Sequence, residues 1–243
     1  MTGTILYIFY ILVTFLMSVV FLIPYLFFLL IRRKSLVRKY VTCVTGFWAR
    51  NIIFMTGSRI KVSGRENLPD SDEICLIGNH QGYMDIPVVL GYVPRRTGFI
   101  AKKELRKVPV LNLWMIALNC IFIDRKNARK SLTGIHRGIS RIREGSTLAI
   151  FPEGTRSRGP CMNPFKTGNL KLIARAGVTI VPLTINGTYR VFEEKHRIHS
   201  SAITLHIHPA IPTSRLSDQQ QAALPETLQQ LIASALPGPP APA

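Results

Sequence analysis

The 243 residues are enough for one sizeable core and for no more than two domains. The chain carries 31 basic and 13 acidic residues, a net charge of +18, so it attracts polyanions such as nucleic acid, anionic membranes or phosphorylated ligands. Residues 1–31 contain no Asp, Glu, Lys or Arg, which argues against nucleic acid as the partner. The four cysteines have no C-x-x-C spacing, which argues against a zinc site and a disulfide scaffold and fits a reducing compartment.

Residues 5–31 form an apolar leader. As a helix it would measure roughly 40 Å at about 1.5 Å per residue, more than the ~30 Å of a bilayer core. It is too long for the core of a signal peptide, and it has neither a basic start nor a clear small-residue cleavage site. The sequence therefore predicts an N-terminal apolar membrane helix. Two forms stay open: a simple anchor, or a bent or re-entrant segment embedded in one leaflet, because Pro24 can kink the helix.

Basic residues follow the leader at once, at Arg32, Arg33, Lys34, Arg38 and Lys39. Under the positive-inside rule they place the rest of the chain on the cytoplasmic side. We therefore expect a protein of the cytoplasmic (inner) membrane whose functional domain faces the cytoplasm. Residues 41–55 are amphipathic and include Phe47 and Trp48, so they are expected at the membrane interface beside the leader.

From residue 58 onward, short apolar runs alternate with helical patterns, which predicts an α/β fold with a mixed sheet flanked by helices. The expected strands cover residues 59–63, 74–78, 98–101, 121–123, 146–151, 178–183 and 202–207. The expected helices cover residues 85–92, 109–118, 128–143 and 168–176. We divide the chain into a membrane-anchoring helical region (1–57), an α/β domain (58–214), and a C-terminal helix with a Pro-rich tail (215–243). Residues 237–243 are expected to be disordered.

The segment N-H-Q-G-Y-M-D, residues 79–85, places a histidine and an aspartate at the end of an expected strand and the start of an expected helix. Ligands of open α/β sheets bind at such strand ends. From the first helical turn the Asp85 carboxylate can reach one imidazole nitrogen of His80, which fixes the tautomer and leaves the other nitrogen free as a base. The alternative is an aspartate N-cap beside an ordinary loop histidine.

The segment F-P-E-G-T-R-S-R, residues 151–158, suits the binding of an anion. Gly154 lets the backbone approach a ligand closely, and Arg156 can hold a phosphate through two N–H groups. Arg158 and Lys166 add positive charge, and Glu153 is expected to be ionised and to hold Arg156 in place. The alternative is a polar surface turn.

A second basic cluster follows the expected strand 98–101 and consists of Lys102, Lys103, Arg106 and Lys107. Most of such a cluster is by default a solvated or membrane-facing run of charge. We expect one lysine of the cluster, Lys102, to reach the ligand.

Four sequence blocks together resemble the glycerolipid acyltransferases, specifically the 1-acyl-sn-glycerol-3-phosphate (lysophosphatidic acid) acyltransferases. His80 and Asp85 match the H-x4-D block, and I-F-I-D-R, residues 121–125, matches the second block. F-P-E-G-T-R-S, residues 151–157, matches the third, and I-V-P-L, residues 180–183, matches the fourth. The segment A-K-K-E-L, residues 101–105, is also similar. The resemblance covers about residues 35 to 210, and the four blocks in this order are specific.

The resemblance implies transfer of an acyl group from an acyl carrier protein or coenzyme A thioester to the sn-2 hydroxyl of lysophosphatidic acid. The product is phosphatidic acid, which places the reaction in phospholipid biosynthesis. The implied partners are membrane lipid, lysophosphatidic acid, and the acyl carrier protein or coenzyme A thioester, without nucleic acid. A thioester is already activated, so neither a metal, a cofactor nor a covalent intermediate is expected.

The resemblance also assigns roles to single residues. His80 would be the general base and Asp85 its partner. The acceptor site would include Arg156 on the phosphate, together with Glu153, Gly154, Thr155, Lys102 and Arg125. Which groups stabilise the oxyanion of the tetrahedral intermediate does not follow from the sequence.

Three other functions stay open at this point. The first is an acyltransferase with another acceptor, such as a lyso-ornithine lipid or a lysophospholipid. The second is a hydrolase in which Cys75 or Cys161 pairs with His80 as a nucleophile, although neither cysteine lies in a nucleophile-type turn. The third is a non-catalytic basic membrane-binding protein, which would not need His80.

Overall fold

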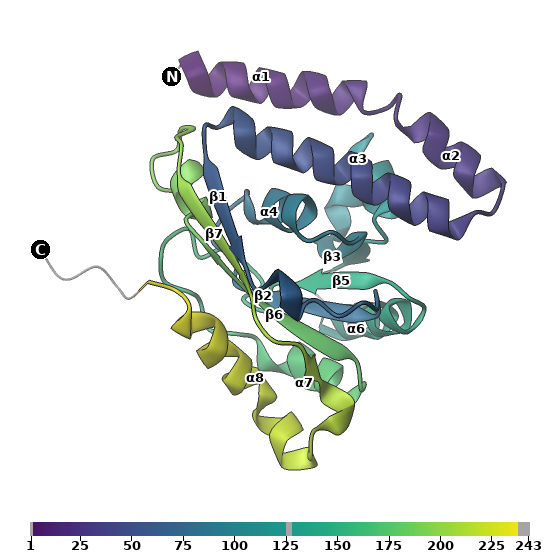
Figure 1. Ribbon diagram of the computed structural model, residues 1–243, viewed down its shortest axis with the longest axis vertical. Helices are drawn as coiled ribbons and strands as arrows, with labels where there is room; N and C mark the ends of the chain where they lie inside the picture. The colour runs from purple at the N-terminus through teal and green to yellow at the C-terminus, as the bar shows by residue number, and fades with distance from the viewer. Residues whose placement is uncertain (1, 125–127, 238–243) are drawn as a thin grey trace, which may run out of the picture.

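The computed structural model describes residues 2–124 and 128–237 (Figure 1). Within these residues the strands form one eight-stranded sheet in the order β1-β7-β6-β2-β5-β3-β4, with β8 against β6. The strands are β1 (Arg59–Ser63), β2 (Ile74–Gly78), β3 (Thr97–Lys102), β4 (Ile121–Ile123), β5 (Thr147–Ile150), β6 (Thr179–Asn186), β7 (Ala202–Ile207) and β8 (Ile211–Pro212). The predicted mixed sheet flanked by helices is confirmed, although the short strand β8 was not predicted.

The sheet is parallel at its centre and antiparallel where β6 meets its later partners. β2 pairs in parallel with β5 and β6, and β3 pairs in parallel with β4 and β5. β6 pairs antiparallel with β7 at residues 183–186 and with β8 at residues 179–180. Pro182 lies between these two partners, where its missing N–H is not needed, and its carbonyl accepts a bond from His208 N at 2.9 Å. A proline is therefore tolerated in a central strand.

Helices cover both faces of the sheet. One face packs against α3 (Lys34–Met55), α4 (Asp85–Tyr92) and α5 (Leu111–Ala117), and the other against α6 (Ala128–Arg143), α7 (Thr167–Arg175) and α8 (Asp218–Ser234). β2 shows the division, because Leu76 belongs to the first core and Cys75 and Ile77 to the second. All five residues of β2 are buried, which explains its unbroken apolar sequence.

The apolar leader is broken into two helices, α1 (Thr2–Met17) and α2 (Leu22–Leu30). The break lies about one turn before Pro24, because proline cannot donate to the carbonyl four residues earlier and its ring clashes with that carbonyl. At the break, Leu22 N and Ile23 N bond instead to carbonyls three residues back, at 2.9 and 3.2 Å. The predicted kink is therefore confirmed, and it falls at residues 18–21.

The leader lies along α3 and runs opposite to it (Figure 1). Tyr7 Oη donates to Ile52 O at 3.0 Å, and Tyr40 Oη donates to Phe21 O at 2.7 Å. Among the described residues, Thr2–Leu30 is the one segment long and apolar enough to cross a membrane, and 17% of its most apolar window is buried. The leader is thus tied to the domain on one side and exposes apolar side chains on the other.

The remaining differences lie mostly at element ends. The amphipathic segment expected at 41–55 begins earlier, at Lys34, and β6 continues to Asn186. α8 packs its buried side chains into the same core as α7 and the sheet, and its N-terminus carries a capping box between Ser217 and Gln220. Residues 238–243, most of the tail expected to be disordered, lie outside the described residues.

Candidate active site

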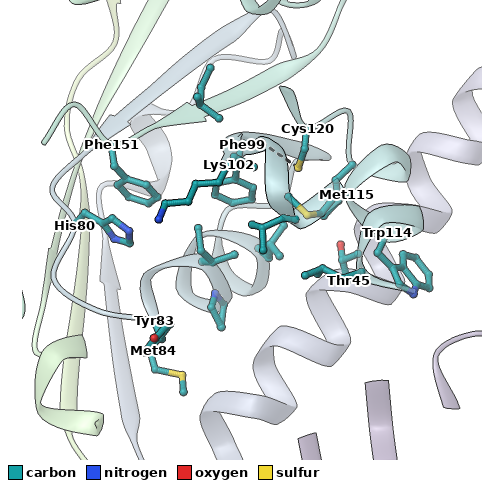
Figure 2. Close-up of a pocket in the computed structure, with 18 of the residues that line it drawn as sticks. Thr45, His80, Tyr83, Met84, Phe99, Lys102, Trp114, Met115, Cys120 and Phe151 are labelled. Carbon is teal, nitrogen blue, oxygen red and sulfur yellow. Dashed lines mark hydrogen bonds between the residues drawn. The ribbon is translucent and has the colours of Figure 1, made fainter. Parts of the chain in front are cut away.

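The predicted site residues meet at the carboxyl edge of the parallel strands. His80 follows β2, Phe151 follows β5, and Lys102 ends β3. Because these three strands are parallel neighbours, their carboxyl ends open on the same edge of the sheet. Figure 2 shows His80, Phe151 and Lys102 together at one end of a cavity, with the Lys102 amine directed toward the histidine.

His80 and Asp85 form a directly bonded pair. His80 Nδ1 lies 2.6 Å from Asp85 Oδ2, and the same oxygen accepts a bond from Gly82 N at 2.9 Å. Asp85 Oδ1 accepts the Thr188 hydroxyl, and the carboxylate is fully buried. These donors fix the carboxylate, which in turn holds a proton on Nδ1 of His80 and leaves Nε2 toward the cavity. The alternative of an aspartate N-cap is wrong, because Met84 occupies the N-cap position of α4.

The loop that carries His80 is bonded to the end of β6. The Asn79 side chain donates to Ile185 O and accepts from Ile185 N, both at 2.8 Å. The side-chain amide thus makes the two hydrogen bonds that a backbone residue of a neighbouring strand would otherwise make. Gln81 Oε1 accepts from Gly187 N at 2.9 Å. Asn79 and Gln81 flank His80 in the sequence, but their roles depend on contacts to residues about a hundred positions away. No local pattern in the sequence therefore indicates these roles.

The first and third sequence blocks lie side by side. Ser157 N donates to His80 O at 2.7 Å, and Arg158 N donates to Gln81 O at 3.1 Å. Gly154 has φ +72, a left-handed conformation that favours glycine, and the Lys166 side chain packs close to it, with Nζ 2.8 Å from where a Cβ would lie. Thr155 is exposed at the same turn. The structure thus brings the turn at 154–158 beside the histidine.

Glu153 was expected to hold Arg156 in place, but it binds other groups. Its carboxylate is buried and accepts His80 N at 2.6 Å and Asn163 N at 2.9 Å. Burial raises the pKa of this carboxyl, and the hydrogen bonds from the backbone of His80 and Asn163 lower it in part. Glu153 therefore joins the His80 loop to the 152–166 segment behind the site.

Arg156 contacts Glu193 and Tyr83 instead, and neither contact was predicted from the sequence. Arg156 Nη1 donates to Glu193 Oε1 at 2.9 Å, and the guanidinium carbon lies 3.6 Å from the centre of the Tyr83 ring. Glu193 is a buried residue that follows η3 (Thr188–Val191), a short 3-10 helix after β6. A buried carboxylate requires a partner, but among 13 acidic residues the sequence does not say which one reaches Arg156.

The second basic cluster is divided by the structure. Lys102 is exposed and lines the cavity. Lys103 instead pairs with Asp124 of the second block, with Nζ and Oδ2 2.6 Å apart. Arg125, the other predicted site residue of that block, lies outside the described residues.

The cavity has a volume of about 1060 Å³ and is lined mainly by apolar side chains. His80 stacks on Phe151 at one end, with ring centres 4.4 Å apart, and Trp114 lies at the other end beside the leader (Figure 2). Trp114 Nε1 donates to Ser18 Oγ, at the break between α1 and α2, at 2.9 Å. The cavity therefore runs from the histidine to the apolar leader.

Cys75 cannot be a nucleophile beside His80. It is fully buried, and burial raises the pKa of its thiol to about 12, so the reactive thiolate does not form near neutral pH. Its side chain is packed in a core of the sheet and is not among the residues that line the cavity. The hydrolase alternative through Cys75 is therefore wrong.

A histidine oriented by a buried carboxylate, a guanidinium nearby and a long apolar cavity form an arrangement that can activate a hydroxyl on a lipid-like ligand. The comparisons with known proteins agree, because the Acyltransferase family model matches residues 59–186. The chain belongs to this acyltransferase family.

Two curated relatives show the extent of the similarity. A 1-acyl-sn-glycerol-3-phosphate acyltransferase of Borreliella burgdorferi is 30% identical over 76% of this chain and 74% of its own length. The human 1-acyl-sn-glycerol-3-phosphate acyltransferase beta is 29% identical over 78% of this chain and 69% of its own length. Among solved structures, the 1-acyl-sn-glycerophosphate (LPA) acyltransferase PlsC of Thermotoga maritima matches with a TM-score of 0.81 and 28% identity. That match covers 94% of this chain and 91% of the other.

Proposed function

We propose that the protein transfers an acyl group from an acyl thioester, carried by acyl carrier protein or coenzyme A, to the sn-2 hydroxyl of 1-acyl-sn-glycerol-3-phosphate. The observation that carries this proposal is the bonded pair of His80 and Asp85 at one end of the apolar cavity, close to the turn that bears Arg156. The names of the relatives support this acceptor.

The proposed reaction follows from the free imidazole nitrogen. His80 Nε2 takes the proton of the acceptor hydroxyl while its oxygen attacks the thioester carbonyl carbon. The tetrahedral intermediate collapses, the C–S bond breaks, and the leaving thiolate takes the proton back from His80. Asp85 stabilises the imidazolium between these steps without accepting its proton. Neither a metal nor a cofactor takes part in this scheme, and the carrier thioester is a co-substrate.

The phosphate of the acceptor is assigned to the turn at 154–158. Among the described residues Arg156 donates one N–H to Glu193, which leaves other N–H groups of its fork for two parallel bonds to phosphate oxygens. Lys102, at the same end of the cavity as His80, and Lys166, beside Gly154, add positive charge. Arg125 is proposed for the same site from the resemblance alone.

The leader is proposed to hold the enzyme at the cytoplasmic face of the inner membrane. The break at residues 18–21 and the packing of Tyr7 on α3 support a bent segment in one leaflet over a straight anchor. The basic residues at 32–39 support a cytoplasmic domain. In this arrangement lipid chains reach the cavity from the side of α1, which contributes Phe15 to its lining.

A panel of lyso-lipids tests the proposed acceptor. Purified protein with labelled acyl thioesters should give phosphatidic acid from 1-acyl-sn-glycerol-3-phosphate. Its kcat/KM should be at least about tenfold higher than with a lysophosphatidylethanolamine or a lyso-ornithine lipid, because those acceptors lack the phosphate monoester that pairs with Arg156. Equal or better use of an acceptor without a phosphate monoester would contradict the proposal.

A further inference from the structure

We propose that Glu193 and Tyr83 form a clamp that positions Arg156 for the acceptor phosphate. The inference deepens the proposed function and rests on it, because it takes Arg156 as the phosphate-binding residue. Neither Glu193 nor Tyr83 holds one of the defining positions of the four sequence blocks, and Glu193 lies beyond residues 59–186, the part that matches the family model. Both act as positioning residues through Arg156.

The clamp is defined by three short contacts. Glu193 Oε1 accepts Arg156 Nη1 at 2.9 Å and Tyr83 N at 2.7 Å, so one carboxylate oxygen joins the arginine to the His80–Asp85 loop. The guanidinium carbon of Arg156 lies 3.6 Å from the centre of the Tyr83 ring. The carboxylate therefore fixes one edge of the guanidinium, and the ring fixes its plane.

The carboxylate itself has little freedom. The Glu193 side chain is 3% exposed, and among the described residues its Oε2 has no hydrogen-bond partner. A Cβ added at Gly82 would lie 2.7 Å from this oxygen, so the loop fits closely around it. A buried charge left without Arg156 would be costly. This cost favours the conformation in which the Arg156 side chain pairs with Glu193 over the many other rotamers that an arginine can adopt.

The clamp also sets the position of Arg156 relative to the base. Glu193 closely follows η3, and Thr188 at the start of η3 donates its hydroxyl to Asp85. One short segment after β6 therefore binds Asp85, the partner of His80, and also contains Glu193, the partner of Arg156. This shared support keeps the acceptor hydroxyl near His80 when the phosphate is bound to Arg156. The position matters because a misplacement of about 1 Å can cost on the order of a hundredfold in rate.

Steady-state kinetics with separate KM values for acceptor and donor test the clamp. Glu193→Gln keeps the shape and removes the charge, and it should raise the KM for 1-acyl-sn-glycerol-3-phosphate about tenfold, the effect of losing one charge-assisted hydrogen bond. The KM for the acyl donor should change less than about twofold. Glu194→Gln is the matched control, because Glu194 is the exposed neighbour and the change in charge is the same; it should behave as the wild type.

The double variant with Arg156→Ala separates positioning from an independent role. Arg156→Ala alone should raise the acceptor KM, and adding Glu193→Gln should make it no worse. Additive losses, or a Glu193→Gln protein with a wild-type acceptor KM, would overturn the clamp. If Arg156→Ala leaves the acceptor KM unchanged, the phosphate assignment in the proposed function fails instead.

A second variant keeps the test valid if Glu193→Gln does not fold. Tyr83 is 58% exposed, so Tyr83→Leu removes the stacking on Arg156 without opening the core. It should raise the acceptor KM about threefold, in line with the modest value of an exposed cation–π contact, and it should have no effect in the Arg156→Ala background. An unchanged acceptor KM in Tyr83→Leu, or an equal rise in the donor KM, would overturn the role of the ring.

Discussion

At the scale of single residues, the side chains of His80 and Asp85 are each held in one orientation. Asp85 accepts bonds from His80, Gly82 and Thr188, so its carboxylate cannot turn away from the imidazole. The stacking of His80 on Phe151 fixes the plane of the ring. In the proposed reaction, a histidine held in this way is in the correct tautomer before the substrate binds, which lowers the cost of reaching the transition state.

This dependence gives a prediction for the pair. His80→Ala should lose on the order of 10² to 10⁴ in kcat and remain folded and membrane-bound. Asp85→Asn should also lose activity, because an amide favours the wrong imidazole tautomer, but the double variant should be no worse than His80→Ala alone. Single-turnover rates of the four proteins check this. Losses that multiply would give Asp85 a role apart from His80, and more than about a tenth of wild-type kcat in His80→Ala would remove the histidine from the mechanism.

At the scale of elements, the leader forms part of the cavity. α1 contributes Tyr7 and Phe15 to its lining, and Ser18 at the break accepts the indole N–H of Trp114. The end with His80, Phe151 and Lys102 is built by residues after 58. The leader and the end of the cavity that holds His80 therefore come from different parts of the chain, although they line one apolar space.

Deleting residues 1–31 should have two effects. Tight membrane attachment should become weak and salt-sensitive. The apolar leader contributes about 25 cal/mol per Å² of surface buried in lipid, and this contribution is lost. The attachment that remains comes from basic residues, each of which supplies only about 1 kcal/mol near an anionic leaflet. Turnover of short-chain soluble donors should persist, and turnover of long-chain donors should fall, because the wall formed by α1 is gone. Liposome flotation at low and high salt, with both donor assays, checks this. Flotation at high salt would place the anchor elsewhere, and loss of short-chain turnover in a folded protein would make the leader part of the catalytic end.

At the scale of the whole molecule, α8 is fastened to the sheet through a buried histidine. His208 Nε2 lies 2.8 Å from Thr184 Oγ1, and this hydroxyl donates to Ile232 O of α8 at 2.9 Å. The hydroxyl proton is used on Ile232, so the Nε2–H of the imidazole donates to the Thr184 oxygen. Burial, with a smaller contribution from the nearby His206, lowers the pKa of His208 to about 4 and keeps the imidazole neutral near neutral pH.

The lowered pKa makes stability fall in weak acid. Below about pH 6.5 the unfolded chain protonates His208 while the native protein does not, so the free energy of unfolding declines until about pH 4, by up to about 1.4 kcal/mol per pH unit. Above pH 6.5 this contribution is complete and constant. Denaturant unfolding in detergent between pH 4.5 and 7 should show a shallower slope for His208→Gln than for the wild type. His136→Gln, at an exposed position of α6, is the control and should keep the wild-type slope; equal slopes in all three would contradict the prediction.

Local sequence patterns were enough to predict six elements with their bounds and the pairing of His80 with Asp85. β1, β2, α4, β4, α6 and β7 have the predicted bounds, because a buried run such as 74–78, or a helical stripe such as that of α6, is a local pattern. His80 and Asp85 lie five positions apart, so their pairing needed only the strand-to-helix turn between them. The Pro24 kink was likewise a local consequence of one residue.

The tertiary structure decided which distant groups meet. From the sequence, Arg156 was expected to pair with Glu153, three positions away. The Glu153 carboxylate instead accepts two backbone N–H groups, and Arg156 pairs with Glu193. That choice depends on β6 lying beside β2, which brings the segment after β6 to the His80 loop. The leader was equally undecided, because an apolar segment is stable both in lipid and against α3, and its packing on α3 through Tyr7 is a long-range contact. The local sequence placed His80 beside Asp85, and the order of the strands in the sheet set the partner of Arg156.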